Sequence, residues 1–228
     1  MNLLLLGRGK TGSQVAEVAA ERKHHLQVSG SRDNLNGAAI HAERLRGIDV
    51  VLDFTAPHCV LANIEGCVNA GKNMVVGTTG WYKEIDRVRD LVNQHDTGFI
   101  YGANFSVGVN IFLEMTRAAA AALRHDYSGQ IFERHHVHKK DAPSGTAIVM
   151  QNILRETSST KQNVEITSFR EGEVVGLHEI VLESKADRIY LCHDAKSRRG
   201  FAEGAVLAAE WLSGKKGFYE FKDIWREL

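Results

Sequence analysis

The sequence contains little proline and cysteine and no repeated or low-complexity segment. Pro57 and Pro143 are its two prolines among 228 residues, and both stand where we expect a helix to start. Cys59, Cys67 and Cys192 are odd in number, widely spaced and without a CxxC pair. These features argue against a proline-rich linker, a repeat architecture and a disulfide framework, and they predict reduced, mostly buried thiols.

The sequence also has no excess of either charge. Lys and Arg number 28, as do Asp and Glu, so the formal net charge is zero. A chain without a basic surplus lacks the electrostatic pattern of a nucleic-acid or anionic-membrane partner. No run approaches the ~20 apolar residues of a membrane span, and residues 1–7 lack the basic start of a signal peptide. We therefore expect a cytoplasmic protein of one large or two small domains.

The densest group of titratable side chains lies in residues 133–147, where three histidines and two lysines occur within six residues. The alternation ahead of this group predicts a strand that runs into a loop. Behind it, Asp141 and Ser144 are good N-cap residues and Pro143 suits a first helical position. Because free N–H groups at a helix start bind carboxylate or phosphate, the segment predicts an anion site beside a proton donor.

Two other interpretations of this segment are a histidine-rich surface loop and a metal site, since His-Xaa-His spacing can hold a metal. The cation density, the capping residues and Gly145-Thr146, which lets a ligand approach the backbone, favour the anion site. We expect neither thiolates nor carboxylates to cluster with the histidines, and the lysines would repel a dication. No metal ligand is predicted.

A glycine-rich turn follows the first apolar run, residues 3–6. The helix pattern behind the turn places Val15, Val18 and Ala19 on one face. A G-x-G-x-x-G motif between a strand and a helix indicates dinucleotide binding, with the pyrophosphate at the helix start. The motif consists of Gly7, Arg8, Gly9, Lys10, Thr11 and Gly12.

The second strand pattern ends in Ser31 and Arg32, where a dinucleotide fold usually carries an acidic residue for the ribose 2′-hydroxyl. Ser31 brings no repelling charge, and the Arg32 guanidinium can meet a 2′-phosphate. Asp33 beside them weakens this argument. The pair favours NADPH over NADH and leaves both open.

Strand and helix patterns alternate as far as residue 101, which predicts a parallel sheet with ligands at the carboxyl ends of its strands. The strand ends at 53–55 and 77–79 are rich in threonine and are interpreted as walls of the cofactor site, Phe54 included. Beyond residue 107, a helix over about 111–123 and the histidine-rich segment precede three consecutive strand patterns. Consecutive strands indicate a second, mostly antiparallel sheet.

The predicted fold class is α/β with two domains. Residues 1–106 and 198–228 form a Rossmann-like dinucleotide-binding domain, completed by the C-terminal segment. Residues 107–197 form an α+β substrate-binding and oligomerisation domain with a mostly antiparallel sheet.

Taken together, these segments resemble the dihydrodipicolinate reductase (4-hydroxy-tetrahydrodipicolinate reductase) family of bacterial lysine and diaminopimelate synthesis. The matching motifs span essentially the whole chain in the family's order. They are Asp53-Phe54-Thr55, Gly77-Thr78-Thr79-Gly80, Ala103 through Asn110, His135-His136 through Lys139 to Ala147, Gly172 through Gly176 with His178, Ser197-Arg198, Phe201-Ala202, Gly204-Ala205 and Trp211-Leu212.

The resemblance implies reduction of 4-hydroxy-tetrahydrodipicolinate to tetrahydrodipicolinate by hydride transfer from NADPH or NADH, in a homotetramer assembled through residues 107–197. His135 corresponds to the family's proton donor, and Lys139 to its partner in protonation and substrate binding. The residues implied at the substrate carboxylates are His136, Ser144, Gly145 and Thr146. Those implied at the nicotinamide and its ribose are Gly77, Thr78, Thr79, Gly102, Ala103, Asn104 and Phe105.

The chain departs from the family pattern at its cofactor end. Its glycine turn is one residue shorter than in many members, which leaves the roles of Arg8 and Lys10 at the phosphates open, and Ser31 replaces the usual acidic residue. Two other functions compete with the one implied. The first is a nicotinamide oxidoreductase acting on another amino or oxo acid. The second is a non-catalytic NADP(H) sensor, which would not need the histidine and lysine set.

Overall fold

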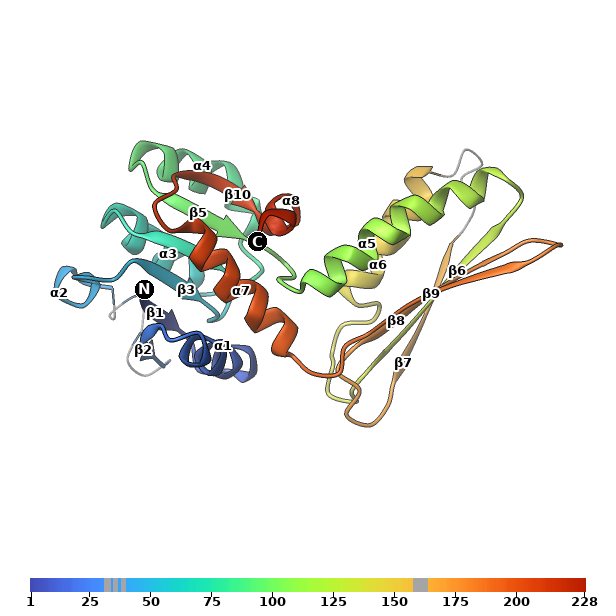
Figure 1. Ribbon diagram of the computed structural model, residues 1–228, viewed down its shortest axis with the longest axis horizontal. Helices are drawn as coiled ribbons and strands as arrows, with labels where there is room; N and C mark the ends of the chain where they lie inside the picture. Colours follow the sequence, from blue (N-terminus) through green and yellow to red (C-terminus); the bar gives the residue numbers. More distant parts are fainter. Residues whose placement is uncertain (31–33, 35–36, 38–39, 158–163) are drawn as a thin grey trace. The chain divides into compact units, whose positions relative to one another are not determined.

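The computed structural model describes the whole chain except residues 31–33, 35–36, 38–39 and 158–163, so the predicted contacts of Ser31 and Arg32 lie outside the described residues. The chain divides into two compact units (Figure 1). The first unit comprises Met1–Val107 with Arg198–Leu228, and the second comprises Gly108–Ser197.

The first unit is built on a six-stranded parallel sheet of strand order β10-β5-β4-β3-β1-β2. The strands are β1 (Asn2–Leu6), β2 (His25–Ser29), β3 (Val50–Asp53), β4 (Asn73–Val76), β5 (Gly98–Tyr101) and β10 (Gly217–Glu220). Because β10 pairs with β5 from Gly217 opposite Gly98 onward, the C-terminal segment adds the last strand of this sheet.

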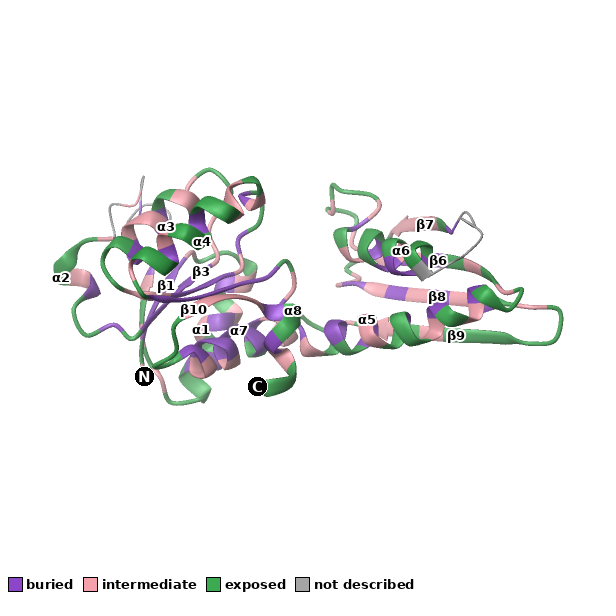
Figure 2. Cartoon of the chain, turned by 90° about the horizontal axis from the view of Figure 1, so that it is seen from above, coloured by how far each residue is buried: buried purple, intermediate pink, exposed green. Residues whose placement is uncertain are grey.

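Helices cover both faces of the sheet, so its central strands are buried on both sides. The helical elements of this unit are α1 (Lys10–Glu21), α2 (Ala42–Leu45), α3 (Val60–Asn69), η2 (Tyr82–Glu84), α4 (Ile85–Gln94), α7 (Arg199–Leu212), α8 (Phe221–Ile224) and η4 (Trp225–Glu227). Leu3 and Leu5 pack in the core that includes α1 and α7, whereas Leu4 and Leu6 pack in the core that includes α3 and α4. All four leucines are fully buried (Figure 2). Because β1 faces a core on each side, it requires an uninterrupted apolar run.

The second unit packs two helices against one face of a four-stranded sheet of order β7-β6-β8-β9. Its elements are α5 (Val107–Ala119, whose first residue belongs to the first unit), η3 (Ala120–Arg124), β6 (Ser128–His135), α6 (Gly145–Thr157), β7 (Glu165–Arg170), β8 (Leu177–Glu183) and β9 (Arg188–Asp194). Strands β6 and β7 are parallel, and the other two pairs are antiparallel. The predicted fold class, a Rossmann-like sheet plus an α+β unit with a mostly antiparallel sheet, is confirmed.

Three local predictions are wrong: the helix starts at the two prolines, the start of α5 and the burial of the cysteines. Pro57 lies in a turn closed by the Cys59 N–H on the Ala56 carbonyl (3.1 Å), and α3 begins only at Val60. Pro143 also precedes its helix. The Ser144 hydroxyl accepts the Ala147 N–H (3.3 Å), so Ser144 is the cap and α6 begins at Gly145.

The other two local corrections concern α5 and the cysteines. Helix α5 begins at Val107 rather than near residue 111, because Val109 and Asn110 already bury one face of it. Among the thiols only Cys67 is buried; Cys59 is half-buried and Cys192 is exposed on β9. In the part of the chain that the structure describes, no helix combines the length and apolar character needed to span a membrane.

Candidate functional site

Two adjoining cavities lie where the glycine turn meets the carboxyl ends of β1, β3 and β4. They share Gly9, Phe54 and Thr55 in their walls. One has a volume of about 310 Å³ and is lined by Gly9, Lys10, Thr11, Gly12, Phe54, Thr55, Pro57, Gly77, Thr78 and Thr79. The other has a volume of about 470 Å³ and is lined by Gly7, Arg8, Gly9, Gly30, Asn34, Phe54, Thr55, Ala56, His58 and Cys59. The structure therefore brings the predicted glycine-turn and strand-end residues together around one hollow.

The shape of the glycine turn depends on Gly7 and Gly12. Gly7 has a φ of 101°, and a Cβ on it would lie 2.2 Å from the Phe54 carbonyl oxygen. A Cβ on Gly12 would lie 2.3 Å from the Gly7 carbonyl oxygen. Gly9, by contrast, caps α1 at a place where a Cβ would meet no described heavy atom within 4 Å other than its chain neighbours. The turn thus leaves open space beside the first N–H groups of α1, which is the arrangement that binds phosphate.

The predicted residues after β5 lie close to this hollow but do not line either cavity. The Gly102 N–H donates to the Val76 carbonyl at the end of β4 (3.2 Å). The Asn104 side chain accepts the Ser106 N–H (2.9 Å), which shapes the turn that leads into α5. Phe105 is buried, with its ring centroid 6.1 Å from that of Phe54. Ala103 is exposed between them.

A buried carboxylate, Asp53, ties the two threonine-rich strand ends together. Its Oδ1 accepts the hydroxyls of Thr78 (2.6 Å) and Thr55 (2.7 Å), and the Thr55 N–H donates to the Thr78 hydroxyl (2.7 Å). Its Oδ2 accepts the Asn63 amide (2.7 Å), which in turn accepts the Asn34 amide (2.9 Å). Burial raises the pKa of Asp53, and the hydrogen bonds from Thr78, Thr55 and Asn63 partly oppose that rise. The network fixes both loops that wall the cavities.

In the second unit, β6 turns Ile131, Glu133 and His135 to the same, buried face of the sheet. Glu133 is fully buried and His135 is 7% exposed. One carboxylate oxygen of Glu133 meets His135 Nδ1, and the other accepts Arg170 Nη2 at 2.8 Å. Strand pairing explains the cluster, because β7 places Arg170 opposite His135 and β8 places His178 opposite Glu133.

The helix start beside β6 joins this cluster through His178. The Ser144 hydroxyl lies 3.2 Å from His178 Nε2, and the rings of His178 and His135 meet edge to face with centroids 5.2 Å apart. Ser144 is buried, while Gly145 and Thr146 form the exposed and half-exposed first residues of α6. Among the predicted substrate residues, the structure therefore brings His135 and Ser144 together through His178 at one end of the sheet, with Gly145 and Thr146 on the adjoining helical turn.

Lys139 and His136 lie in the loop between β6 and α6. Lys139 Nζ pairs with both carboxylate oxygens of Asp141 (2.8 and 2.9 Å), and this contact lowers the pKa of Asp141. The positive charge of Lys139 also lowers the pKa of His135 and of His178. His136 is half-buried, and its ring centroid is 6.2 Å from that of His138.

Burial and neighbouring charges set the protonation of the three central groups. Burial would raise the pKa of Glu133, but hydrogen bonds from Arg170, Ser168 and His135 outweigh it, and the net direction is down. Burial lowers the pKa of His178 to about 4. Burial also lowers the pKa of His135. The attraction of Glu133 raises this pKa and the repulsion of Lys139 and Arg170 lowers it, and the net direction is down. Near neutral pH, Glu133 is thus a carboxylate and His178 a neutral imidazole.

The expectation that carboxylates do not cluster with the histidines is wrong. Potential ligand atoms of Glu133, His135 and His178 all lie within 4.8 Å of one another. Pairing between strands, rather than closeness in the sequence, assembles them. Both Glu133 oxygens are engaged by Arg170 and His135, so a dication would have to displace a guanidinium from the carboxylate. The cluster has the character of an ion-pair network.

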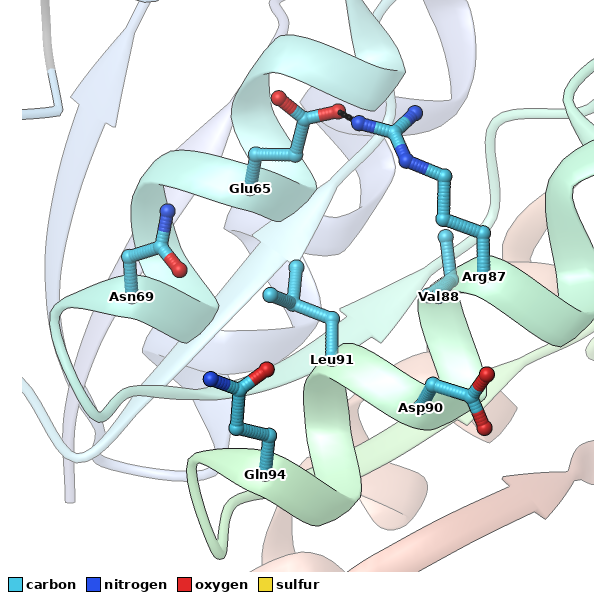
Figure 3. A pocket seen from close by; sticks show the side chains of 7 residues that line it. All are labelled: Glu65, Asn69, Arg87, Val88, Asp90, Leu91 and Gln94. Carbon is cyan, nitrogen blue, oxygen red and sulfur yellow. Dashed lines mark hydrogen bonds and ion pairs between the residues drawn. The ribbon is translucent and has the colours of Figure 1, made fainter.

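A further hollow of about 530 Å³ lies between α3 and α4 (Figure 3) and shares no lining residue with the two cavities at the glycine turn. Its walls are Glu65, Asn69, Arg87, Val88, Asp90, Leu91 and Gln94. Its one ion pair joins the exposed side chains of Glu65 and Arg87 (2.6 Å), and exposed pairs of this kind contribute little energy. We assign no function to it.

Comparisons with known proteins match the entire chain to one family. The family model for the dihydrodipicolinate reductase N-terminus matches residues 1–105, and that for the C-terminus matches residues 108–225. The chain belongs to the dihydrodipicolinate reductase family. A 4-hydroxy-tetrahydrodipicolinate reductase from Christiangramia forsetii is 38% identical over 100% of this chain and 99% of its own length. One from Acinetobacter baylyi is 33% identical over 93% of this chain and 81% of its own length.

A solved structure, the dipicolinate-bound dihydrodipicolinate reductase from Paenisporosarcina sp. TG-14, has a TM-score of 0.80 at 22% identity and covers 98% of this chain and 99% of its own. An engineered D-amino acid dehydrogenase bound to NADP⁺ has a TM-score of 0.54 at 12% identity, covering 98% of this chain and 93% of its own. At these identities the two structures establish the fold alone. The resemblance to the reductase family found in the sequence is confirmed.

The buried groups Asn63, Glu133 and Arg170 had no predicted role, and Asp53 was predicted only as part of a wall of the cofactor site. Asp53 and Glu133 could have been found, because an acidic residue on the buried face of a strand needs partners. Arg170 could not, because only the register between β6 and β7 places it beside His135.

The Thr78 hydroxyl both donates to Asp53 and accepts from the Thr55 N–H, so its loss removes one hydrogen bond from each of these groups. We expect Thr78→Val to lower the free energy of unfolding by about 1–3 kcal/mol. Urea denaturation followed by circular dichroism measures the change. The matched control is Thr79→Val, whose side chain is exposed and should cost less than about 0.5 kcal/mol. Equal effects of the two substitutions would contradict the assigned network.

Proposed function

We propose that the chain reduces 4-hydroxy-tetrahydrodipicolinate to tetrahydrodipicolinate with NAD(P)H, in lysine and diaminopimelate biosynthesis, and that its two units share the work. In this proposal the first unit holds the reduced dinucleotide, and the second binds the dicarboxylate and supplies the proton. The observation that carries it is the cluster of His135, Ser144 and the first turn of α6, in a chain that matches the reductase family from end to end.

The hollow of the first unit fits a dinucleotide. The glycine turn exposes the first N–H groups of α1 beside open space, so residues 7–12 would hold the pyrophosphate. Phe54 with residues 77–79 and 102–105 would surround the nicotinamide and its ribose. When bound, the reduced nicotinamide supplies the hydride.

The substrate end of the site suits a dianion. In our assignment, the N–H groups of Gly145 and Thr146 and the Ser144 hydroxyl receive one carboxylate, because the start of α6 carries partial positive charge. Lys139 and His136 provide charge and donors for the other. The ion pair between Lys139 and Asp141 is exposed, so the ammonium can exchange Asp141 for a substrate carboxylate at little cost.

His135 is assigned as the proton donor. Hydride addition to a conjugated imine leaves an enamine-like anion, and a nearby imidazolium can protonate it. A general acid of this kind contributes roughly 10²–10⁴ in rate. The buried position of His135 keeps bulk water from competing for the proton.

For His135→Ala we expect kcat to fall by about 10²-fold or more, with little change in KM, because the proton donor acts in the transition state. Steady-state oxidation of NADPH in the presence of the dihydrodipicolinate precursor measures both parameters. The control is His138→Ala, an exposed neighbour with no assigned role. A near-normal kcat for His135→Ala would remove that residue from the acid's role.

We propose a preference for NADPH over NADH, supported by Ser31 and Arg32 after β2. Arg32→Ala should raise the KM for NADPH by about 10-fold or more, because it removes a charge-assisted hydrogen bond to the 2′-phosphate. The KM for NADH should change little. The assay compares oxidation of the two cofactors by the wild type and the variant. An equal rise in the KM for NADPH and the KM for NADH would contradict the assignment of the 2′-phosphate to Arg32.

We also propose that the second unit forms a homotetramer through the outer face of its sheet, the face opposite α5 and α6. Paired residues place six apolar or thiol side chains on this face, half-buried or exposed in the single chain. They are Phe132, Phe169, Leu177, Val181, Tyr190 and Cys192. Tyr190 alone is 63% exposed. A sheet face of this composition is suited to burial against another copy.

Light scattering should give the wild-type chain about four times its 25.3 kDa mass. The double substitution Val181→Arg with Tyr190→Asp places opposite charges on the outer face and should reduce the assembly to dimers or monomers. Lys185→Asp, in the turn between β8 and β9, is the control and should leave the mass unchanged. A wild-type monomer, or a double variant that stays tetrameric, would contradict this interface.

A further inference from the structure

A fully buried carboxylate lies directly beneath the assigned proton donor. Glu133 is 0% exposed, and its two oxygens meet His135 Nδ1 and Arg170 Nη2. Arg170 Nη2 also donates to the Asp141 carbonyl at 2.5 Å, which anchors the guanidinium to the loop before α6. Glu133 is therefore held from both sides and cannot turn away from His135 without breaking an ion pair.

The surroundings of His135 are otherwise unfavourable to an imidazolium. Arg170 on β7 and Lys139 in the loop repel a proton on His135. His178 on β8 is neutral and has His193 behind it, the Ser144 hydroxyl faces it from α6, and Asp141 is engaged by Lys139. A site that attracts a doubly negative substrate must be cationic, and the same cations disfavour a protonated acid. Glu133 supplies the opposing charge.

We propose that Glu133 is a positioning residue that keeps a proton on His135 Nδ1, leaves Nε2 to the substrate and favours the imidazolium form against burial and the surrounding cations. This inference rests on the proposed role of His135. In the proton-transfer step the Nε2–H bond breaks, a C–H bond forms on the substrate anion, and the N–H electron pair stays on Nε2. The neutral ring that remains keeps its Nδ1–H bond to Glu133, and a proton from solvent restores the imidazolium.

The far side of the ring supports this orientation. A Cβ on Gly176 would lie 3.1 Å from His135 Nε2, tighter than side chains normally approach. Gly176 precedes β8 and is buried, so the backbone itself forms the wall next to Nε2. Glu133 thus occupies Nδ1, and the absence of a side chain at Gly176 keeps Nε2 from being covered.

The test is Glu133→Gln, which keeps a hydrogen-bond acceptor for Nδ1 but removes the charge. We expect the pKa of His135, followed by NMR of its ring, to fall by about one unit or more. The pH at which kcat declines on the alkaline side should fall equally, so that kcat at about pH 8 drops roughly 10-fold and recovers at lower pH. The KM for NADPH should not change. An unchanged ring pKa together with an unchanged pH profile would overturn the proposal.

Three further variants separate charge from folding. Glu133→Asp retains the carboxylate and should restore part of the pH profile. Glu171→Gln removes an exposed carboxylate 3.0 Å from Arg134 and should change neither the pKa nor the profile. Arg170→Gln removes a repelling cation and should raise the ring pKa, so it tests the proposal in the opposite direction even if Glu133→Gln does not fold. A fall or no change in Arg170→Gln would contradict it.

The ring pKa is measured without turnover. A wild-type chain that fails to reduce the dihydrodipicolinate precursor would refute the proposed function while leaving the effect of Glu133 on His135 measurable. Conversely, an active wild type whose His135 pKa is indifferent to Glu133→Gln would refute only the further inference.

Discussion

The chemistry that we propose for the second unit depends on the contact between the Glu133 carboxylate and the His135 ring. Burying a carboxylate is costly unless it is paired and hydrogen-bonded, and here Arg170 and His135 occupy its two oxygens. The contact fixes the ring and sets its charge in a region that Arg170 and Lys139 make positive.

The first unit uses a buried carboxylate differently. Asp53 is surrounded by neutral donors, the hydroxyls of Thr55 and Thr78 and the amide of Asn63, and burial raises its pKa. Glu133 has charged partners, and its pKa is lowered. Neutral donors hold the two loops in place and suit the wall of the proposed dinucleotide site. Charged partners suit the proton donor that we propose for the second unit.

Much of the fold could be predicted because its signals are local. Strand β1 covers the predicted apolar run, residues 3–6, and β5 ends at residue 101, where the alternation of strands and helices is predicted to end. The helix starts near Pro57 and Pro143 were placed too early, because proline suits the turn before a helix as well as its first residue. The alternation in 131–136 correctly predicted a strand, yet its buried face carries Glu133 and His135, and the meaning of that pair was missed.

What could not be predicted depends on pairing between distant segments. The meeting of Arg170 with His135, and of His178 with Glu133, follows from strand register, which local sequence does not reveal. The Asn34–Asn63–Asp53 chain likewise joins three separate segments. The preference for NADPH over NADH, which depends on Ser31 and Arg32, stays a prediction.

In our proposal, a cationic cluster around His135 receives the dicarboxylate and carries the proton. Calorimetric titration with pyridine-2,6-dicarboxylate in the presence of NADPH, repeated in buffers of different ionisation enthalpy between about pH 6 and about pH 9, tests this arrangement. We expect that binding weakens as the pH rises and that a proton is taken up on binding in the alkaline part of this range. Binding with constant affinity and without proton uptake across the range would contradict it.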